Sequence, residues 1–147
     1  MKLEGKYSFK ATPETLWELF TDPKYLEKTI PGCEKITERE PGKYDITVKI
    51  GISAVKGTYN GTFEVADPAP PNRCRLIGEG SGGPGFAKGE STVEMTQQGD
   101  TTVVTYNGEG QVGGLIAGVG QRLISGIAKM LLGQFFRNIK KVLKSQT

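Results

Sequence analysis

The chain has 147 residues, a length typical of a single domain of about 100 to 200 residues. It is 36% hydrophobic and 24% charged, as globular proteins are, and its formal net charge is +3. It contains no histidine, which excludes His-containing catalytic triads and histidine-based metal centres. We therefore expect one domain over residues 1–147, without a metal site.

The first nine residues alternate charged and apolar side chains and lack the apolar core of a secretory signal. The longest apolar runs are far shorter than the roughly 20 residues of a membrane span. We expect a cytoplasmic protein whose two cysteines, Cys33 and Cys74, are reduced.

The first predicted element is a strand, because Leu3, Tyr7 and Phe9 alternate with polar side chains.

Two short helices should follow this strand. Thr12-Pro13-Glu14 combines an N-cap residue with proline at the first helical position, and Asp22-Pro23 repeats the combination. A succession of strands comes next, because apolar side chains recur at every second position between turn signals. The turn signals are Pro41-Gly42, Pro68 to Asn72, Gly82 to Gly85 and Gly99-Asp100. Connections of this length predict one antiparallel meander.

Glycine is abundant in these strands, and the 21 glycines are twice the usual share of about 7%. Several fall where bulky inward side chains would be expected, namely Gly5, Gly57, Gly61, Gly78, Gly108 and Gly110. One interpretation is that they permit strong sheet curvature. The other is that they leave the interior partly hollow, and the two are compatible.

From Leu115 to about Ser145 the apolar spacing becomes helical, which predicts a long amphipathic helix able to cover the concave face of the sheet. Glycines in its first half should make Gly114 to Gly120 easy to open, as a gate. The opposite side of the helix is basic and carries Arg122, Lys129, Arg137, Lys140, Lys141 and Lys144. This side is either a docking surface for a membrane or partner protein, or simply a solvated face.

Catalytic patterns are missing from the sequence. Gly78 to Gly89 contains Lys88 but lacks the Gly-Lys-Ser/Thr ending of a phosphate-binding loop, so we interpret it as a flexible hairpin. No carboxylate pair or activated nucleophile is recognisable, and we assign no catalytic residue. The basic residues are not interleaved with aromatic ones, so nucleic acid is not an expected partner.

The order of elements resembles that of the START-like superfamily. Within it, the chain resembles the G-subunit family of carbon monoxide dehydrogenase over nearly its full length. The motifs that carry this resemblance are Pro13-Glu14 with Trp17, Asp22-Pro23, Ile30-Pro31-Gly32-Cys33, Gly57-Thr58-Tyr59, Gly80 to Gly89, and Val112-Gly113-Gly114-Leu115. The resemblance implies an α+β helix-grip fold, in which a curved antiparallel sheet wraps around the C-terminal helix.

The resemblance also implies a function. A cavity between sheet and helix should bind a hydrophobic small molecule, such as an isoprenoid quinone or a lipid, without a further cofactor. The protein would be a non-catalytic accessory of a carbon monoxide dehydrogenase-type molybdenum hydroxylase, peripheral at the inner face of the membrane, and would help recruit that enzyme. Two rival hypotheses are a START-like enzyme, such as a cyclase, and a docking module with a solid core.

We predict that the ligand contacts apolar side chains from the strands, the hairpin tip and the helix. These are Tyr44, Ile46, Val48, Tyr59, Phe63, Phe86, Met95, Tyr106, Leu115, Val119, Leu123, Ile127 and Leu131.

Overall fold

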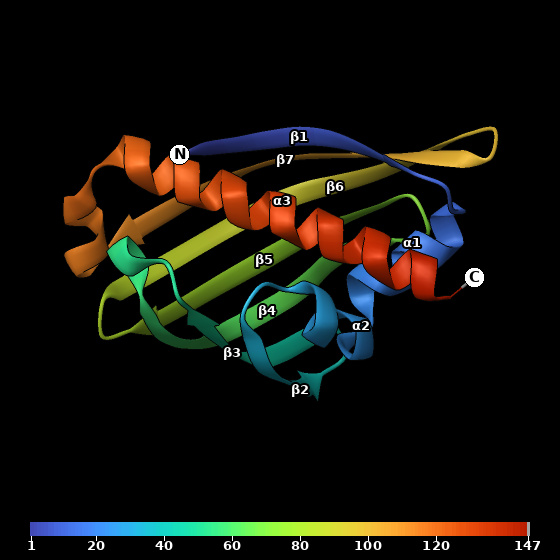
Figure 1. Ribbon diagram of the computed structural model, residues 1–147. Helices are drawn as coiled ribbons and strands as arrows, with labels where there is room; N and C mark the ends of the chain where they lie inside the picture. Colours follow the sequence, from blue (N-terminus) through green and yellow to red (C-terminus); the bar gives the residue numbers. More distant parts are fainter. Residues whose placement is uncertain (147) are drawn as a thin grey trace.

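The protein is described by a computed structural model that covers residues 1–146 in the detail used below (Figure 1). Its strands are β1 (Lys2–Phe9), β2 (Cys33–Glu40), β3 (Lys43–Ile50), β4 (Gly57–Ala69), β5 (Arg73–Gly82), β6 (Gly85–Gln98) and β7 (Thr101–Gly113). Its helices are α1 (Pro13–Thr21), α2 (Pro23–Thr29) and α3 (Gln121–Ser145), with the short 3₁₀ turns η1 (Ser53–Val55) and η2 (Gly114–Val119).

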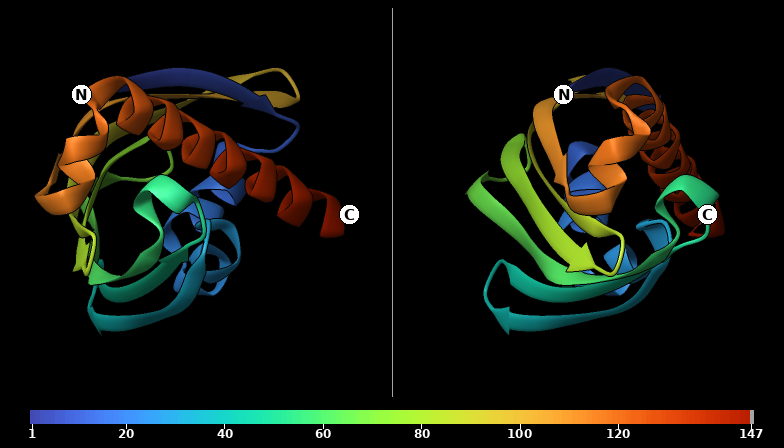
Figure 2. Two further views of the ribbon diagram at one scale, coloured as in Figure 1. Left: turned by 60° about the vertical axis from the view of Figure 1, so that its left-hand side comes forward. Right: turned by 90° about the vertical axis from the view of Figure 1, so that its left-hand side faces the viewer.

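The strands form one seven-stranded antiparallel sheet in the order β1-β7-β6-β5-β4-β3-β2. The predicted meander is confirmed for β2 to β7, and β1 closes the other edge by pairing with β7, with Lys2 opposite Glu109. The sheet curves around α3, which crosses its concave face from one end to the other (Figures 1 and 2). The predicted α+β helix-grip architecture is therefore confirmed.

The two short helices begin as the sequence predicts. The Thr12 hydroxyl accepts a hydrogen bond from the Thr15 amide at 3.2 Å, and the Asp22 carboxylate accepts one from the Lys24 amide at 2.9 Å. These side chains satisfy amide groups that have no partner within the helix, which fixes where each helix begins. Asn138 of α3 donates to the Thr29 carbonyl oxygen at 3.0 Å, so α3 is tied to α2.

The predicted helix from Leu115 is wrong in its first turn. Residues Gly114–Val119 form the separate turn η2, and α3 begins only at Gln121. Gly114 and Gly120 both have positive φ, +77° and +100°, which other residues rarely adopt. The chain therefore changes direction at both ends of η2, while Gly126 and Gly133 remain inside the helix.

The interior has two apolar clusters. The larger lies at the α1 end, where Leu16, Leu19 and Phe20 pack with the Phe136 side of α3. The smaller contains Val55, Ile116, Ile124 and Ile127, at the end where η1 and η2 approach α3. The interior between the sheet and α3 is not completely filled by these clusters.

Candidate ligand-binding cavity

A cavity of about 530 Å³ lies between the concave face of the sheet and α3. Its apolar wall comes from β3, β4, α2 and α3, with examples in Ile46, Phe63, Leu26 and Leu131. The volume is within the range of about 300 to 1,000 Å³ that is usual for small-molecule sites. The space is large enough for a small molecule and has an almost entirely hydrocarbon surface.

Glycines form much of the cavity's sheet side, and the two interpretations of these residues apply at different positions. A Cβ atom at Gly61 or Gly108 would collide with the backbone carbonyl of Glu79 or Glu90, so the close strand approach requires glycine there. At Gly78 a Cβ would meet only the Thr62 carbonyl oxygen, at 3.9 Å. Curvature explains the first two positions, whereas the third leaves empty space above the sheet.

Polar side chains are few inside the cavity. Glu79 and Lys88 adjoin it through their backbone, but their side chains lie on the convex face because Gly78, Gly80 and Gly89 take the inward positions. Among residues 1–146, strand alternation directs only the hydroxyls of Tyr59 and Ser91 toward the cavity. Burial raises the pKa of Tyr59, so its phenol stays protonated and neutral at ordinary pH.

One end of the cavity is covered by η1 and η2. Ile116 of η2 is buried against Val55 of η1 and against Ile124 and Ile127 of α3. The backbone amide of Ile116 donates to the Pro84 carbonyl oxygen at 2.9 Å, which holds η2 to the β5–β6 hairpin. Both turns lie at the same end of the sheet (Figure 2).

The thirteen predicted ligand contacts fall into three groups. Six line the cavity: Ile46, Val48, Tyr59, Phe63, Ile127 and Leu131. Three pack outside it. Tyr44 and Met95 are buried, and Tyr106 stacks on Phe136 with ring centroids 5.3 Å apart. The part of α3 that packs against α1 fills that region. Strand periodicity alone does not reveal this packing.

The remaining four predicted contacts, Phe86, Leu115, Val119 and Leu123, are exposed near the start of α3. Leu115 has 80% of its surface accessible. Val119, Leu123 and Met130 border a shallow open groove together with Arg122. We name Leu115, Val119, Leu123 and Met130 the apolar cluster. It adjoins the covered end of the cavity rather than the cavity interior.

Several lining residues were not predicted as contacts. Met1 and Leu3 reach the cavity because β1 pairs with β7. Leu26 and Ile30 reach it because α2 lies on the concave side of the sheet, as α3 does (Figure 1). Ile116 does so through η2. The helical spacing that pointed to Ile127 and Leu131 also includes Ile124 and Phe135, which line the cavity too, so the full inward face of α3 was the available signal.

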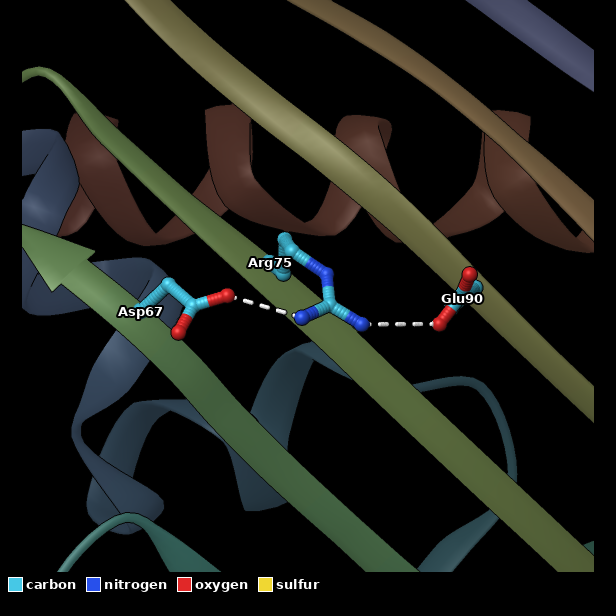
Figure 3. A network of polar contacts seen from close by, with 3 residues as sticks. All are labelled: Asp67, Arg75 and Glu90. Carbon is cyan, nitrogen blue, oxygen red and sulfur yellow. Dashed lines mark hydrogen bonds and ion pairs between the residues drawn. The ribbon is translucent and has the colours of Figure 1, made fainter.

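The six basic side chains of α3 are all exposed: Arg122, Lys129, Arg137, Lys140, Lys141 and Lys144. Within residues 1–146, Arg122 and Lys129 have no ion-pair partner. The convex face of the sheet carries ion pairs instead. Arg75 of β5 bridges Asp67 of β4 and Glu90 of β6, at 2.7 and 3.0 Å (Figure 3).

No helix within residues 1–146 is both long enough and apolar enough to cross a bilayer. Both cysteines are free thiols in the structure, and burial raises the pKa of Cys74 to about 11. A buried thiol of this kind is a poor nucleophile.

Known proteins share this fold. A conserved protein from Geobacillus kaustophilus is 37% identical over 99% of this chain and 96% of its own, with a TM-score of 0.95. A START superfamily protein from Mycobacterium smegmatis is 15% identical, with 99% of both chains covered and a TM-score of 0.79. Protein CV1439 from Chromobacterium violaceum is also 15% identical, covering 96% of this chain and 95% of its own, at a TM-score of 0.74.

No curated protein has a significant match to the chain. The family model of the carbon monoxide dehydrogenase G subunit (CoxG) matches residues 5–144, which is almost the whole chain. With this match, and with the START-type architecture seen around the cavity, the chain belongs to the CoxG family, the G-subunit family of carbon monoxide dehydrogenase.

Proposed function

We propose that the protein binds a neutral hydrophobic molecule in the cavity and carries it without transforming it. The observation that supports this most directly is the cavity itself, which is about 530 Å³ in volume and bounded by hydrocarbon side chains and glycines. Burying a charged ligand group here would be costly, since no ionised side chain of residues 1–146 faces the cavity. Without ionised side chains, this part of the structure also offers no acid–base pair to the ligand, which disfavours catalysis.

Family membership supports a more specific proposal. The ligand is an isoprenoid quinone or a lipid, and the protein is an accessory of a carbon monoxide dehydrogenase-type molybdenum hydroxylase. The family description names carbon monoxide dehydrogenase. An elongated hydrocarbon ligand suits the cavity's direction, which follows α3 from Phe135 to Ile124.

The surface near η2 supports peripheral contact with the inner face of a membrane. The apolar cluster is exposed there beside Arg122 and Lys129, and residues 113–147 contain no acidic side chain. Apolar side chains flanked by cations bind anionic bilayers through both insertion and charge. Because η2 also covers the cavity, a ligand would pass between bilayer and cavity by displacement of Gly114 to Gly120.

Native mass spectrometry of protein purified from its own cells, with organic extraction of bound molecules, tests ligand binding. A stoichiometric quinone or neutral lipid is the expected result. Protein that is empty and also fails to bind added quinones would overturn the carrier function.

Vesicle cosedimentation tests the membrane contact. We expect binding to phosphatidylglycerol vesicles, weaker binding to phosphatidylcholine vesicles, and loss of binding in Leu115→Ser/Leu123→Ser. Ile77→Ser, which removes an apolar side chain from the convex face between Glu64 and Glu90, is the matched control. If the double variant cosediments with phosphatidylglycerol vesicles as well as the wild type does, the membrane contact is contradicted.

A protein-docking role for α3 is the second candidate, favoured by the exposure of all its basic side chains. Reversing charge at Lys140, Lys141 and Lys144 would then abolish capture of the molybdenum hydroxylase and leave ligand binding intact. Unchanged capture would remove this candidate.

A further inference from the structure

Ser91 is a polar residue in the wall of the cavity, and the apolar character of the cavity does not explain it. It occupies an inward position of β6, opposite Leu76 of β5 on one side and Gly108 of β7 on the other. Its hydroxyl donates to the Thr92 carbonyl oxygen at 3.4 Å, which is long for an O–H···O bond. The hydroxyl can therefore exchange this weak bond for a better one.

Ser91 has a side-chain neighbour on β5 but none on β7. Gly108 offers no side chain next to the hydroxyl, and Gly89 occupies the next inward position along β6. Gly89 pairs with Gly78 on one neighbouring strand and with Gly110 on the other. Adjacent strands lie about 4.8 Å apart, so the cavity wall across these three glycines is about 10 Å wide and consists of peptide groups without side chains.

Packing within the protein leaves part of the volume above this surface unfilled. A Cβ at Gly78 would meet only the Thr62 carbonyl oxygen, at 3.9 Å. A Cβ at Gly110 would touch the side chains of Leu3 and Met1 at 3.7 Å, so the unfilled volume lies over Gly78 rather than over Gly110. The opposite wall is formed by aliphatic side chains of α3, including Ile127 and Leu131. A flat ring can lie directly against a wall that carries no side chains, whereas a branched group touches such a wall with fewer atoms.

We propose that Ser91 determines ligand specificity by donating a hydrogen bond to an acceptor oxygen on a flat, uncharged ring. The ring lies against the peptide surface at Gly78 and Gly89, and its hydrocarbon remainder lies along α3. This inference rests on the proposed function and narrows it to neutral ligands with an oxygen-bearing ring. Tyr59 is less suited to this role, because its hydroxyl already donates to the Val55 carbonyl oxygen.

Equilibrium dialysis with two matched probes tests this role. Menadione carries two ring carbonyl oxygens, and 2-methylnaphthalene has the same ring skeleton without them. We expect Ser91→Ala to weaken menadione binding about three- to tenfold, the usual effect of one neutral hydrogen bond, and to leave 2-methylnaphthalene binding unchanged. Ser91→Thr retains the hydroxyl and should retain menadione affinity. Thr92→Ala, which removes a hydroxyl from the convex face, is the matched control.

A second pair of variants tests the ring position. Gly78→Val places a side chain in the open volume and should weaken both ring probes at least about tenfold, since an occupied site cannot take the ring. Gly83→Ala, in the β5–β6 turn where a Cβ meets nothing within 4 Å, should change neither. Thermal unfolding confirms that each variant is folded.

The failures are distinguishable. If Ser91→Ala weakens both probes equally, or neither, the hydrogen-bonding role is overturned. If the wild type binds the acyclic hydrocarbon farnesene but neither ring, the ring inference is overturned and the carrier function stands. If none of the three probes binds, both proposals are overturned.

Discussion

The Tyr59 hydroxyl donates a hydrogen bond to the carbonyl oxygen of Val55, 2.5 Å away. Tyr59 belongs to β4 and lines the cavity, whereas Val55 belongs to η1 and covers the cavity end. The bond therefore ties the cover to the wall. Ile116 packs against Val55 from η2, so the bond also stabilises the contact between the two turns.

Tyr59→Phe should loosen the cover while preserving the apolar wall. We expect unfolding free energy to fall by about 1 kcal/mol, because the Val55 carbonyl loses its partner. Bound ligand should dissociate faster in a competition experiment. Tyr25→Phe is the control, since the Tyr25 hydroxyl accepts its bond from Gln146 at the far end of α3. Equal dissociation rates in wild type and Tyr59→Phe would contradict a covering role for η1.

Gly120 and Gly126 should respond in opposite directions to the same change. Gly120 has φ +100°, so Gly120→Ala should destabilise the protein by about 1 kcal/mol or more. Gly126 lies inside α3, and a Cβ added there would meet nothing within 4 Å, so Gly126→Ala should stabilise by up to about 1 kcal/mol. Urea unfolding measures both. Stabilisation by Gly120→Ala would show that the break before α3 is not required.

Cys74 should make stability fall at alkaline pH. Burial raises the pKa of its thiol from 9.0 to about 11, so between these values the unfolded chain releases a proton that the folded chain keeps. The contribution is complete below pH 9 and is lost as pH rises toward 11. Between pH 7.5 and about 10.5, the stability advantage of wild type over Cys74→Ala should shrink by about 2 kcal/mol in urea unfolding. A constant difference would be the contrary result.

The Arg75 bridge should matter little. The hydrogen bonds that Arg75 donates to the Asp67 and Glu90 carboxylates raise the pKa of Arg75, but its guanidinium is exposed on the convex face. Exposed ion pairs contribute little to stability because water and salt screen them, so Arg75→Met should leave the unfolding temperature nearly unchanged and should not alter ligand affinity. Calorimetry at low and high salt checks both expectations. A large loss of ligand affinity would reveal coupling between the two faces of the sheet.

Local patterns predicted most of the fold. Strand alternation, turn residues and the caps at Thr12 and Asp22 depend on neighbours in the sequence, and these elements appear where expected. The pairing of β1 with β7 joins residues more than ninety positions apart, so no local pattern indicates it. The break at Gly120 was missed because apolar spacing continues across it, whereas only the positive φ shows the change of direction.

The cavity was less predictable than the fold. Alternation correctly placed Tyr106 and Met95 on the concave side, but it does not say what lies opposite each residue. Phe136 and α1 fill the space beside them, whereas short side chains and glycines leave space beside Ile46 and Phe63. Which positions along α3 face empty space depends on the packing of several elements at once. Whether the lining residues bind a ligand stays a prediction.

The position of α3 after the sheet has a consequence for biosynthesis. All seven strands leave the ribosome before the helix that covers them, and β1 must wait for β7 before it can pair. During this interval the concave apolar surface is open to water and to other nascent chains. Chaperones that hold exposed hydrophobic segments should therefore engage the growing chain until residues 121–145 emerge.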